Sequence, residues 1–250
     1  MILSTLFLYL TLAGCAILLA TVVVKYDLYR REPWWLLLAA TILGALAMQA
    51  AGWLQTWIIL AMNARGHSIG DTLYSTIAGV SEESGKLAAV AITALLARRH
   101  FDEPLDGLIF GSFAGLGAAL AESVSVLGFD QTTFLPPPQE PIRLAGHLIM
   151  GGIGGFGVGL LVLPSRRART AIVLFFLTAV IFHIGWNMVA FAAANYYHLY
   201  GKLLPWHTFT PVCLMIAGMI LYRRLVAVGA RLTRDHLQVC DVETNRCPPE

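Results

Sequence analysis

Seven long apolar runs constrain the fold of this chain more than any other feature. A helix rises about 1.5 Å per residue, so each run is long enough to cross a hydrocarbon core of about 30 Å. The runs are Ile2–Val24, Trp34–Met62, Thr72–Ala97, Leu105–Leu127, Arg143–Leu163, Thr170–Ala194 and Trp206–Leu225. Only 13% of the residues are charged, about half the share in a soluble domain. Because backbone in lipid must satisfy its own hydrogen bonds, we predict an all-α, polytopic bundle of seven transmembrane helices.

The distribution of Lys and Arg predicts how the bundle is oriented. Three basic residues, Arg65, Arg143 and Lys202, lie on one side of the predicted membrane. The other side and the tail carry Lys25, Arg30, Arg31, Arg98, Arg99, Arg166, Arg167, Arg169, Arg223, Arg224, Arg231, Arg234 and Arg246. Since cytoplasmic loops are enriched in basic residues, the N-terminus is expected outside and the C-terminus in the cytoplasm. We expect the first run to be a retained helix, because no Lys or Arg precedes it.

The third run contains three charged residues where lipid-facing helices avoid them. Glu82, Glu83 and Lys86 lie near its middle. A charged side chain at the centre of a membrane helix costs about 2.5 to 3.5 kcal/mol on insertion scales. Intramembrane charges of this kind usually face a bundle interior and serve a function. The runs that follow add Glu122, His147, His183 and Asn187.

Glycine stripes direct two of these residues toward neighbouring helices. Glycines at 107, 111 and 115 repeat every four residues, as do those at 151, 155 and 159. Small residues at this spacing let helix backbones approach closely. Glu122 follows the first stripe by two turns and His147 precedes the second by one turn. Both side chains are therefore expected to point into the bundle.

The expected depths of the polar groups converge in the outer half of the membrane. Glu83 lies about 16 Å from the outer end of its run, and Glu122 and His183 lie about 25 and 20 Å from the cytoplasmic ends of theirs. A water-filled cavity open to the outside would accommodate them. The connection Gly128–Pro141 would then cover the mouth of this cavity.

Each polar residue also has a purely structural explanation. Lys86 is placed to pair with Glu82 or with Glu83 on the same helix, which leaves the other carboxylate unexplained. Glu122 could lie near the outer interface and be partly solvated.

The histidines have similar alternatives. His147 could be an interfacial residue near the end of its helix. His183 and Asn187 share a helix face and could hydrogen-bond to a neighbouring helix. Any one of these structural explanations is more expected than all of them at once.

The chemistry of this set is suited to hydrolysis. A glutamate near histidines can take a proton from water, and a histidine with an amide can donate to an oxyanion. Alternatively, two histidines and one or two glutamates can hold Zn²⁺, which lowers the pKa of bound water. The chain has no HExxH motif, so the helix geometry of zincins is absent. Both forms of water activation stay open at this point.

The order of these motifs resembles that of the PrsW family of intramembrane proteases, relatives of the CAAX prenyl endopeptidase and bacterial Abi proteases. The resemblance rests on Glu82-Glu83-x-x-Lys86, Glu122, His147 and His183-x-x-x-Asn187, and it extends from about Lys25 to Asn187. The segments Tyr26–Pro33 and Asp106–Gly111 also look like the family's. Two positions depart from it: Ala118 stands where relatives usually have Phe, and Asn187 stands at a position where Asp is the alternative.

The resemblance implies site-1-type cleavage of membrane-anchored proteins, such as anti-sigma factors, near the outer membrane face. Glu83 is expected to be the general base, with Glu82 as the next candidate, and Lys86 to hold one carboxylate in place. His183 and Asn187 would stabilise the oxyanion. If Zn²⁺ is the cofactor, the expected ligands are Glu83, Glu122, His147 and His183.

These expectations define the domains and the partners. Residues 1–225 would form the membrane domain, with its catalytic core at about 72–190, and residues 226–250 a polar cytoplasmic tail. The partners would be a membrane-anchored protein substrate and the lipid bilayer of a bacterial cytoplasmic membrane, with no nucleic acid. The alternatives are an ion- or proton-coupled transporter, a non-catalytic membrane scaffold, and a hydrolase of lipid amides. The transporter is less favoured because the chain shows no inverted repeat.

Overall fold

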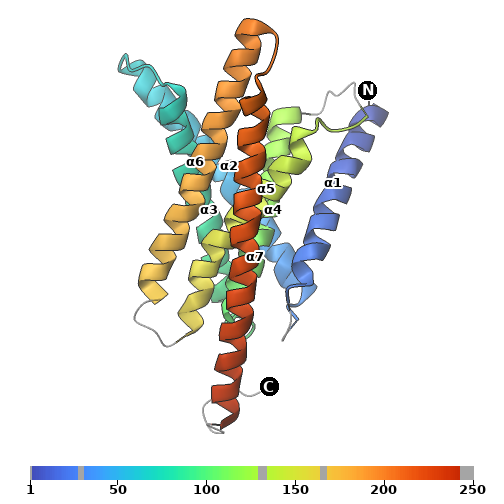
Figure 1. Ribbon diagram of the computed structural model, residues 1–250, viewed down its shortest axis with the longest axis vertical. Helices are drawn as coiled ribbons and strands as arrows, with labels where there is room; N and C mark the ends of the chain where they lie inside the picture. Colours follow the sequence, from blue (N-terminus) through green and yellow to red (C-terminus); the bar gives the residue numbers. More distant parts are fainter. Residues whose placement is uncertain (1, 28–30, 129–133, 164–167, 243–250) are drawn as a thin grey trace.

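The part of the chain that the structure describes folds into a bundle of seven α-helices, which confirms the predicted class. The computed structural model describes residues 2–27, 31–128, 134–163 and 168–242. Within them lie the helices α1 Ile2–Val24, α2 Trp34–Ala64, α3 Asp71–Leu96, α4 Pro104–Leu127, α5 Gln139–Gly159, α6 Ala168–Tyr200 and α7 Pro205–Val242. A single 3₁₀ turn, Leu160–Val162, follows α5. The helices run roughly along one axis and α7 extends beyond the others at its C-terminal end (Figure 1).

Three helices, α5, α6 and α7, differ most in extent from the apolar runs. The α5 helix begins at Gln139 rather than Arg143, so Pro141 lies in its first turn. Proline is tolerated there because the first backbone N–H groups of a helix have no intrahelical partner. The α6 helix continues to Tyr200 and α7 continues to Val242. The stretch predicted as a tail therefore begins inside α7, and residues 243–250 lie outside the described part of the chain.

The helices define a multi-pass membrane protein. Six of those described are long and apolar enough to cross a membrane, and α3 is the exception. Every stretch of 18 residues within α3 contains the three charged residues Glu82, Glu83 and Lys86. The other six spans each include an 18-residue stretch with at most two charged residues. The predicted orientation stays a prediction. Four of the basic residues behind it, Arg30, Arg166, Arg167 and Arg246, lie outside the described residues.

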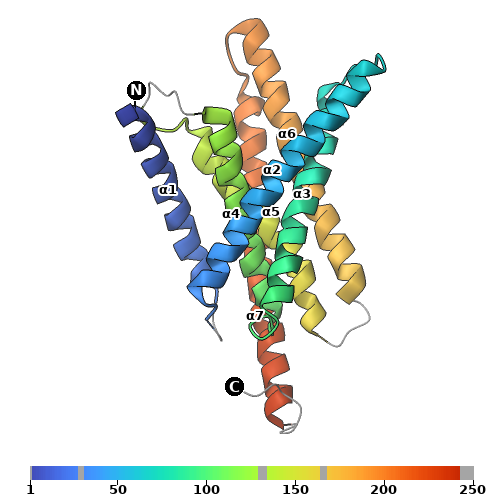
Figure 2. The same ribbon diagram turned by 180° about the vertical axis from the view of Figure 1, so that it is seen from behind.

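The centre of the bundle is the pair α4 and α5. In these helices 78% and 72% of the apolar span is buried by protein, against 22% in α1, which lies at the edge of the bundle (Figures 1 and 2). The view from behind shows α2 crossing over α4 (Figure 2). Helices α4 and α5 thus form the scaffold against which the outer helices pack.

The glycine stripes bring α4 and α5 into direct backbone contact, as the sequence predicts. A Cβ atom on Gly111 would lie 2.2 Å from the carbonyl oxygen of Gly151, and one on Gly115 would lie 2.1 Å from that of His147. Any larger residue would force the two helices apart. A similar close approach joins α3 to α6, where a Cβ atom on Gly79 would lie 2.8 Å from the Ile184 side chain. These contacts fix the positions of His147 and of the turn that carries His183.

Candidate active site

Glu83 lies at the centre of a buried ionic cluster between α3 and α6. Its side chain and that of Lys86 are both 2% exposed, and the two form an ion pair across one helical turn. The second partner of Glu83 is His183 on α6, whose Nδ1 lies 2.7 Å from Glu83 Oε1. The predicted pairing of Lys86 with one of the two glutamates is therefore confirmed, and the partner is Glu83.

Glu82 is differently placed from its neighbour. Its Oε1 accepts a hydrogen bond of 3.2 Å from Gln55 Nε2 on α2, and the same amide donates to Ser81 Oγ at 2.9 Å. Its Oε2 is buried, lies 3.4 Å from His183 Nε2, and has no hydrogen-bond partner among the described residues. Glu82 therefore keeps one free carboxylate oxygen that faces the imidazole.

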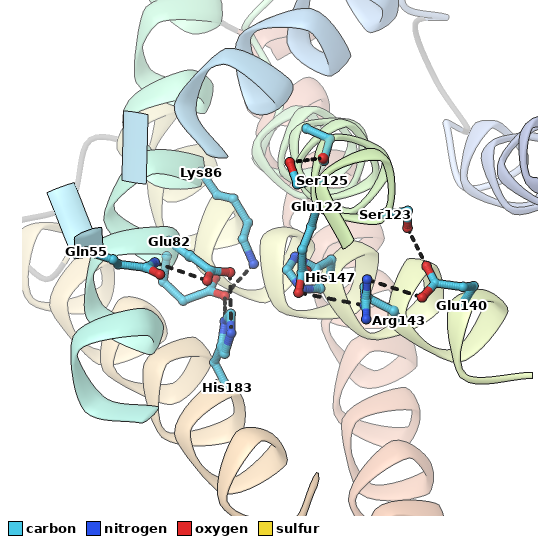
Figure 3. Close-up of polar contacts among 12 residues, drawn as sticks. Gln55, Glu82, Lys86, Glu122, Ser123, Ser125, Glu140, Arg143, His147 and His183 are labelled. Atoms are coloured by element: carbon cyan, nitrogen blue, oxygen red, sulfur yellow. Dashed lines mark hydrogen bonds and ion pairs between the residues drawn. The ribbon is translucent and has the colours of Figure 1, made fainter. Parts of the chain in front are cut away.

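His147 brings a second imidazole to the same place from α5. Its Nε2 lies 3.1 Å from Glu122 Oε2 on α4. The buried Nδ1 has no hydrogen-bond partner among the described residues. The His147 ring meets the His183 ring edge to face, with centroids 5.3 Å apart. Four helices, α3 to α6, therefore contribute to one cluster, which Figure 3 shows from one side.

A second group of polar residues supports Glu122 from behind. Arg143 on α5 lies 3.7 Å from Glu122 Oε1 through its Nε and 3.2 Å from Glu140 Oε1 through its Nη1. Glu140 is only 1% exposed and also accepts a 2.6 Å hydrogen bond from Ser123 Oγ on α4. Through these contacts, Glu140 in the first turn of α5 is linked by way of Arg143 and Glu122 to His147, further along the same helix (Figure 3).

Sequence reasoning missed four of these residues as parts of the site. It treated Arg143 only as a charge that reports orientation and did not single out Gln55, Ser123 or Glu140. An amide within an apolar run and a Glu–Arg pair at i and i+3 were the available signals.

The contacts of the two imidazoles with carboxylates leave three possible electron-pair donors among Glu82, His147 and His183. Carboxylates accept but do not donate, so the ring nitrogen next to Glu83 or to Glu122 carries the proton in a neutral imidazole. The remaining nitrogens, His183 Nε2 and His147 Nδ1, then present lone pairs, as does Glu82 Oε2. One ligand atom from each of Glu82, His147 and His183 lies within 4.8 Å of the other two. Such a group requires a proton or a metal ion to be stable when buried.

The charges of the cluster indicate the same requirement. Its four carboxylates, Glu82, Glu83, Glu122 and Glu140, stand against two cationic side chains, Lys86 and Arg143. Two negative charges are left without compensation when both histidines are neutral, which a divalent cation would offset. The residues therefore fit a bound metal ion. Glu82 and the two histidines form the possible ligand group. Glu83 instead contacts His183 Nδ1, and Glu122 contacts His147 Nε2.

Three expectations from the sequence concern the surroundings of the cluster. No hydrogen bond or ion pair joins Asn187 to it among the described residues, so its role as an oxyanion donor stays a prediction. A cavity of about 420 Å³ lies between α2 and α3 and includes Ser81 in its wall, but a water-filled cavity at the cluster itself stays a prediction. In the proposed cover Gly128–Pro141, residues 129–133 lie outside the described residues, and the last three residues belong to α5.

Fold and site together define a class: a polytopic helical membrane protein that buries glutamates and histidines in a metal-ligand arrangement. The family model described as PrsW family intramembrane metalloprotease matches residues 32–135. This match confirms the resemblance to the PrsW family over these residues and supports an intramembrane protease in general. The match includes Glu82, Glu83, Lys86 and Glu122 but ends before His147 and His183. No curated protein and no solved structure matches the chain.

Proposed function

We propose that this protein hydrolyses a peptide bond in membrane-anchored proteins, with the attacking water activated among Glu82, His147 and His183. The observation that carries the proposal is that ligand atoms of three residues on three helices lie within 4.8 Å of one another. Two buried atoms of these residues, Glu82 Oε2 and His147 Nδ1, have no hydrogen-bond partner among the described residues. A structural ion-pair network would satisfy such atoms, whereas a hydrolytic site needs them free for water or a metal.

Glu82 is the carboxylate we assign to the water, in place of Glu83. Glu83 is held by Lys86 and by His183 Nδ1, so its charge is already compensated. Its role is to orient the imidazole so that Nε2 faces the reaction site. Glu82 retains a free oxygen and is positioned by Gln55 from α2. In a metal-free mechanism Glu82 would take the proton of the attacking water.

The same three residues would hold Zn²⁺ if the enzyme is a metalloprotease. Two imidazole nitrogens and one carboxylate oxygen match the ligand set of catalytic zinc sites, which keep a further position open. When bound, Zn²⁺ lowers the pKa of a coordinated water to about 7. Glu83 and Glu122 would then support the ligands by accepting from the second nitrogen of each ring, as carboxylates do around many zinc sites.

The substrate we propose is a single-pass protein cut near the outer membrane face. The support is the predicted depth of the polar residues, which in the predicted orientation would lie between the middle and the outer surface of the bilayer. Asn187, one turn from His183 on α6, would donate from its side-chain amide to the oxyanion of the peptide bond.

Proteolysis of a reporter tests this function. A single-pass reporter and the purified protein would be reconstituted in liposomes, and cleavage would be followed with and without a chelator. We expect Glu82→Gln and His183→Ala to lower kcat by at least about 100-fold and Glu83→Gln to lower it less. Tyr222→Phe, which removes a buried hydrogen bond of 2.8 Å to Ser112 away from the cluster, serves as the matched control and should cleave normally.

The experiment has three possible outcomes: a metalloprotease, a glutamate mechanism without a metal, or neither. Loss of cleavage on chelation, restored by Zn²⁺, would identify the metalloprotease. Cleavage that resists chelation but requires Glu82 would identify the glutamate mechanism. Equal cleavage by the wild type, Glu82→Gln and His183→Ala would reject the proposed site altogether.

A further inference from the structure

Ser123 and Glu140, which are buried, and the partly buried Arg143 lie outside the group proposed to act on the water. They contact this group through Glu122. We infer that they form a positioning relay, Ser123–Glu140–Arg143–Glu122, which fixes the orientation of His147 and so sets the affinity of the site for its metal. This inference rests on the proposed function, because it assumes that His147 is a ligand.

Within the relay, contacts with its two neighbours hold Glu140 in one position. Its carboxylate is almost fully buried and lies in the first turn of α5, where a negative charge also interacts favourably with the helix dipole. Ser123 on α4 donates to Oε2 at 2.6 Å, and Arg143 approaches Oε1 at 3.2 Å. Because both carboxylate oxygens are engaged, Glu140 has little freedom and restrains Arg143.

Arg143 transmits this restraint to Glu122. Its guanidinium lies between two carboxylates, with Nη1 near Glu140 and Nε 3.7 Å from Glu122 Oε1. The Glu122 side chain is 31% exposed, so without Arg143 it would be free to turn toward water. Arg143 engages Oε1 and leaves Oε2 to face His147 Nε2 at 3.1 Å.

Glu122 in turn selects which nitrogen of His147 is free. The 3.1 Å contact with the carboxylate favours a proton on Nε2, which leaves the lone pair on Nδ1, a buried atom with no hydrogen-bond partner among the described residues. The backbone of His147 cannot adjust independently, because its carbonyl is packed against Gly115. Ring orientation is therefore decided by the contact with Glu122, and outer-shell contacts of this kind typically change metal affinity by about 10- to 100-fold.

A simpler explanation is that Glu140 and Arg143 only join α4 to α5. In that case their substitution would lower thermal stability without changing metal affinity in the protein that stays folded. The relay makes a different prediction, because Glu140 acts on the metal only through Arg143. Effects transmitted along a single path are not additive.

The test measures the Zn²⁺ dissociation constant of the purified full-length protein in detergent by competition with a chromogenic chelator. We expect Arg143→Gln to raise the constant about tenfold and Glu140→Gln to raise it by the same factor or less. The double variant should be no weaker than Arg143→Gln alone. Arg143→Lys, which keeps the charge, should recover most of the affinity, and Tyr222→Phe should bind as the wild type does.

The melting temperature of each variant is measured in parallel. If Glu140→Gln does not fold, Ser123→Ala, which removes one hydrogen bond to Glu140, takes its place and should weaken binding by a smaller factor. Unchanged dissociation constants in folded variants, or losses that add in the double variant, overturn the relay and leave the proposed function intact. A wild-type protein that binds no Zn²⁺ overturns the relay together with the metal centre, while cleavage that requires Glu82 would still stand.

Discussion

At the scale of single residues, neighbours in the sequence have different environments. Glu82 and Glu83 are adjacent on α3, but a helix turns by about 100° per residue. They therefore contact different nitrogens of His183 and differ in their other partners. Glu83 meets Lys86 and His183, while Glu82 meets Gln55 and retains a free oxygen. The chemical role of each carboxylate therefore follows from what surrounds it rather than from its position in the motif.

Glu32, in the connection before α2, gives a pH-dependent prediction. Burial and the nearby carboxylates of Asp106, Asp27, Asp102 and Glu103 raise the pKa of Glu32 to about 9 from its ordinary 4.5. Between these values the folded protein retains a proton that the unfolded chain releases, so stability falls as the pH rises. We expect Glu32→Gln to reduce the loss of melting temperature between about pH 6 and pH 9.

The conservative variant Glu32→Asp serves as the control for this measurement, because it keeps a titrating group at the same place. It should retain most of the pH dependence. An unchanged pH dependence in Glu32→Gln would show that other groups cause it.

At the scale of the helices, small residues decide how close the polar groups can come. The α4–α5 contact at Gly111 and Gly151 leaves no room for a side chain. The same contact continues through Gly115 to His147, and it brings Glu122 and His147 within 3.1 Å of each other. Packing of the helices is thus a precondition for the geometry of the site.

Gly111→Ala should therefore destabilise the bundle. The new methyl group would overlap the Gly151 carbonyl, and overpacking typically costs about 1 to 3 kcal/mol. Gly52→Ala on α2 is the matched control, because a Cβ atom there meets nothing within 4 Å. Alanine in a helix interior is favoured over glycine by about 0.5 to 1 kcal/mol, so this control should be unchanged or slightly stabilised.

Unfolding in a detergent and denaturant mixture measures both variants. Equal stability of Gly111→Ala and the wild type would mean that α4 and α5 are able to separate without loss. In that event the close approach of the two helices would not be what positions His147.

At the scale of the whole molecule, the charge pattern predicts the orientation in the membrane. Exposed positions at the two ends of α3 provide the test: His67 precedes this helix, and Arg99 follows it. In a cysteine-free background, His67→Cys should react with a membrane-impermeant maleimide on intact cells. Arg99→Cys should react only after permeabilisation. The reverse pattern would invert the orientation and move the proposed cleavage to the cytoplasmic half.

Hydropathy predicted the seven helices because each must satisfy its backbone within lipid, and this demand is local to the segment. It failed at the end of α7, since the end of an apolar run marks where lipid contact stops and not where the helix ends. The residues after Leu225 include Ala, Arg and Leu, which favour helix in water as well.

The sequence by itself determined the helices, the residues of the polar set and the glycine faces along which the central helices meet. The partners of each polar group were decided only by the tertiary structure. His183 and Glu83 are 100 residues apart, and whether His183 Nδ1 faces Glu83 depends on the rotation and crossing of two helices. Helical periodicity fixes the direction of a side chain relative to its own axis, whereas the distance to a group on another helix depends on how the two pack. For that reason the free oxygen of Glu82 and the support from Glu140 emerged only in three dimensions.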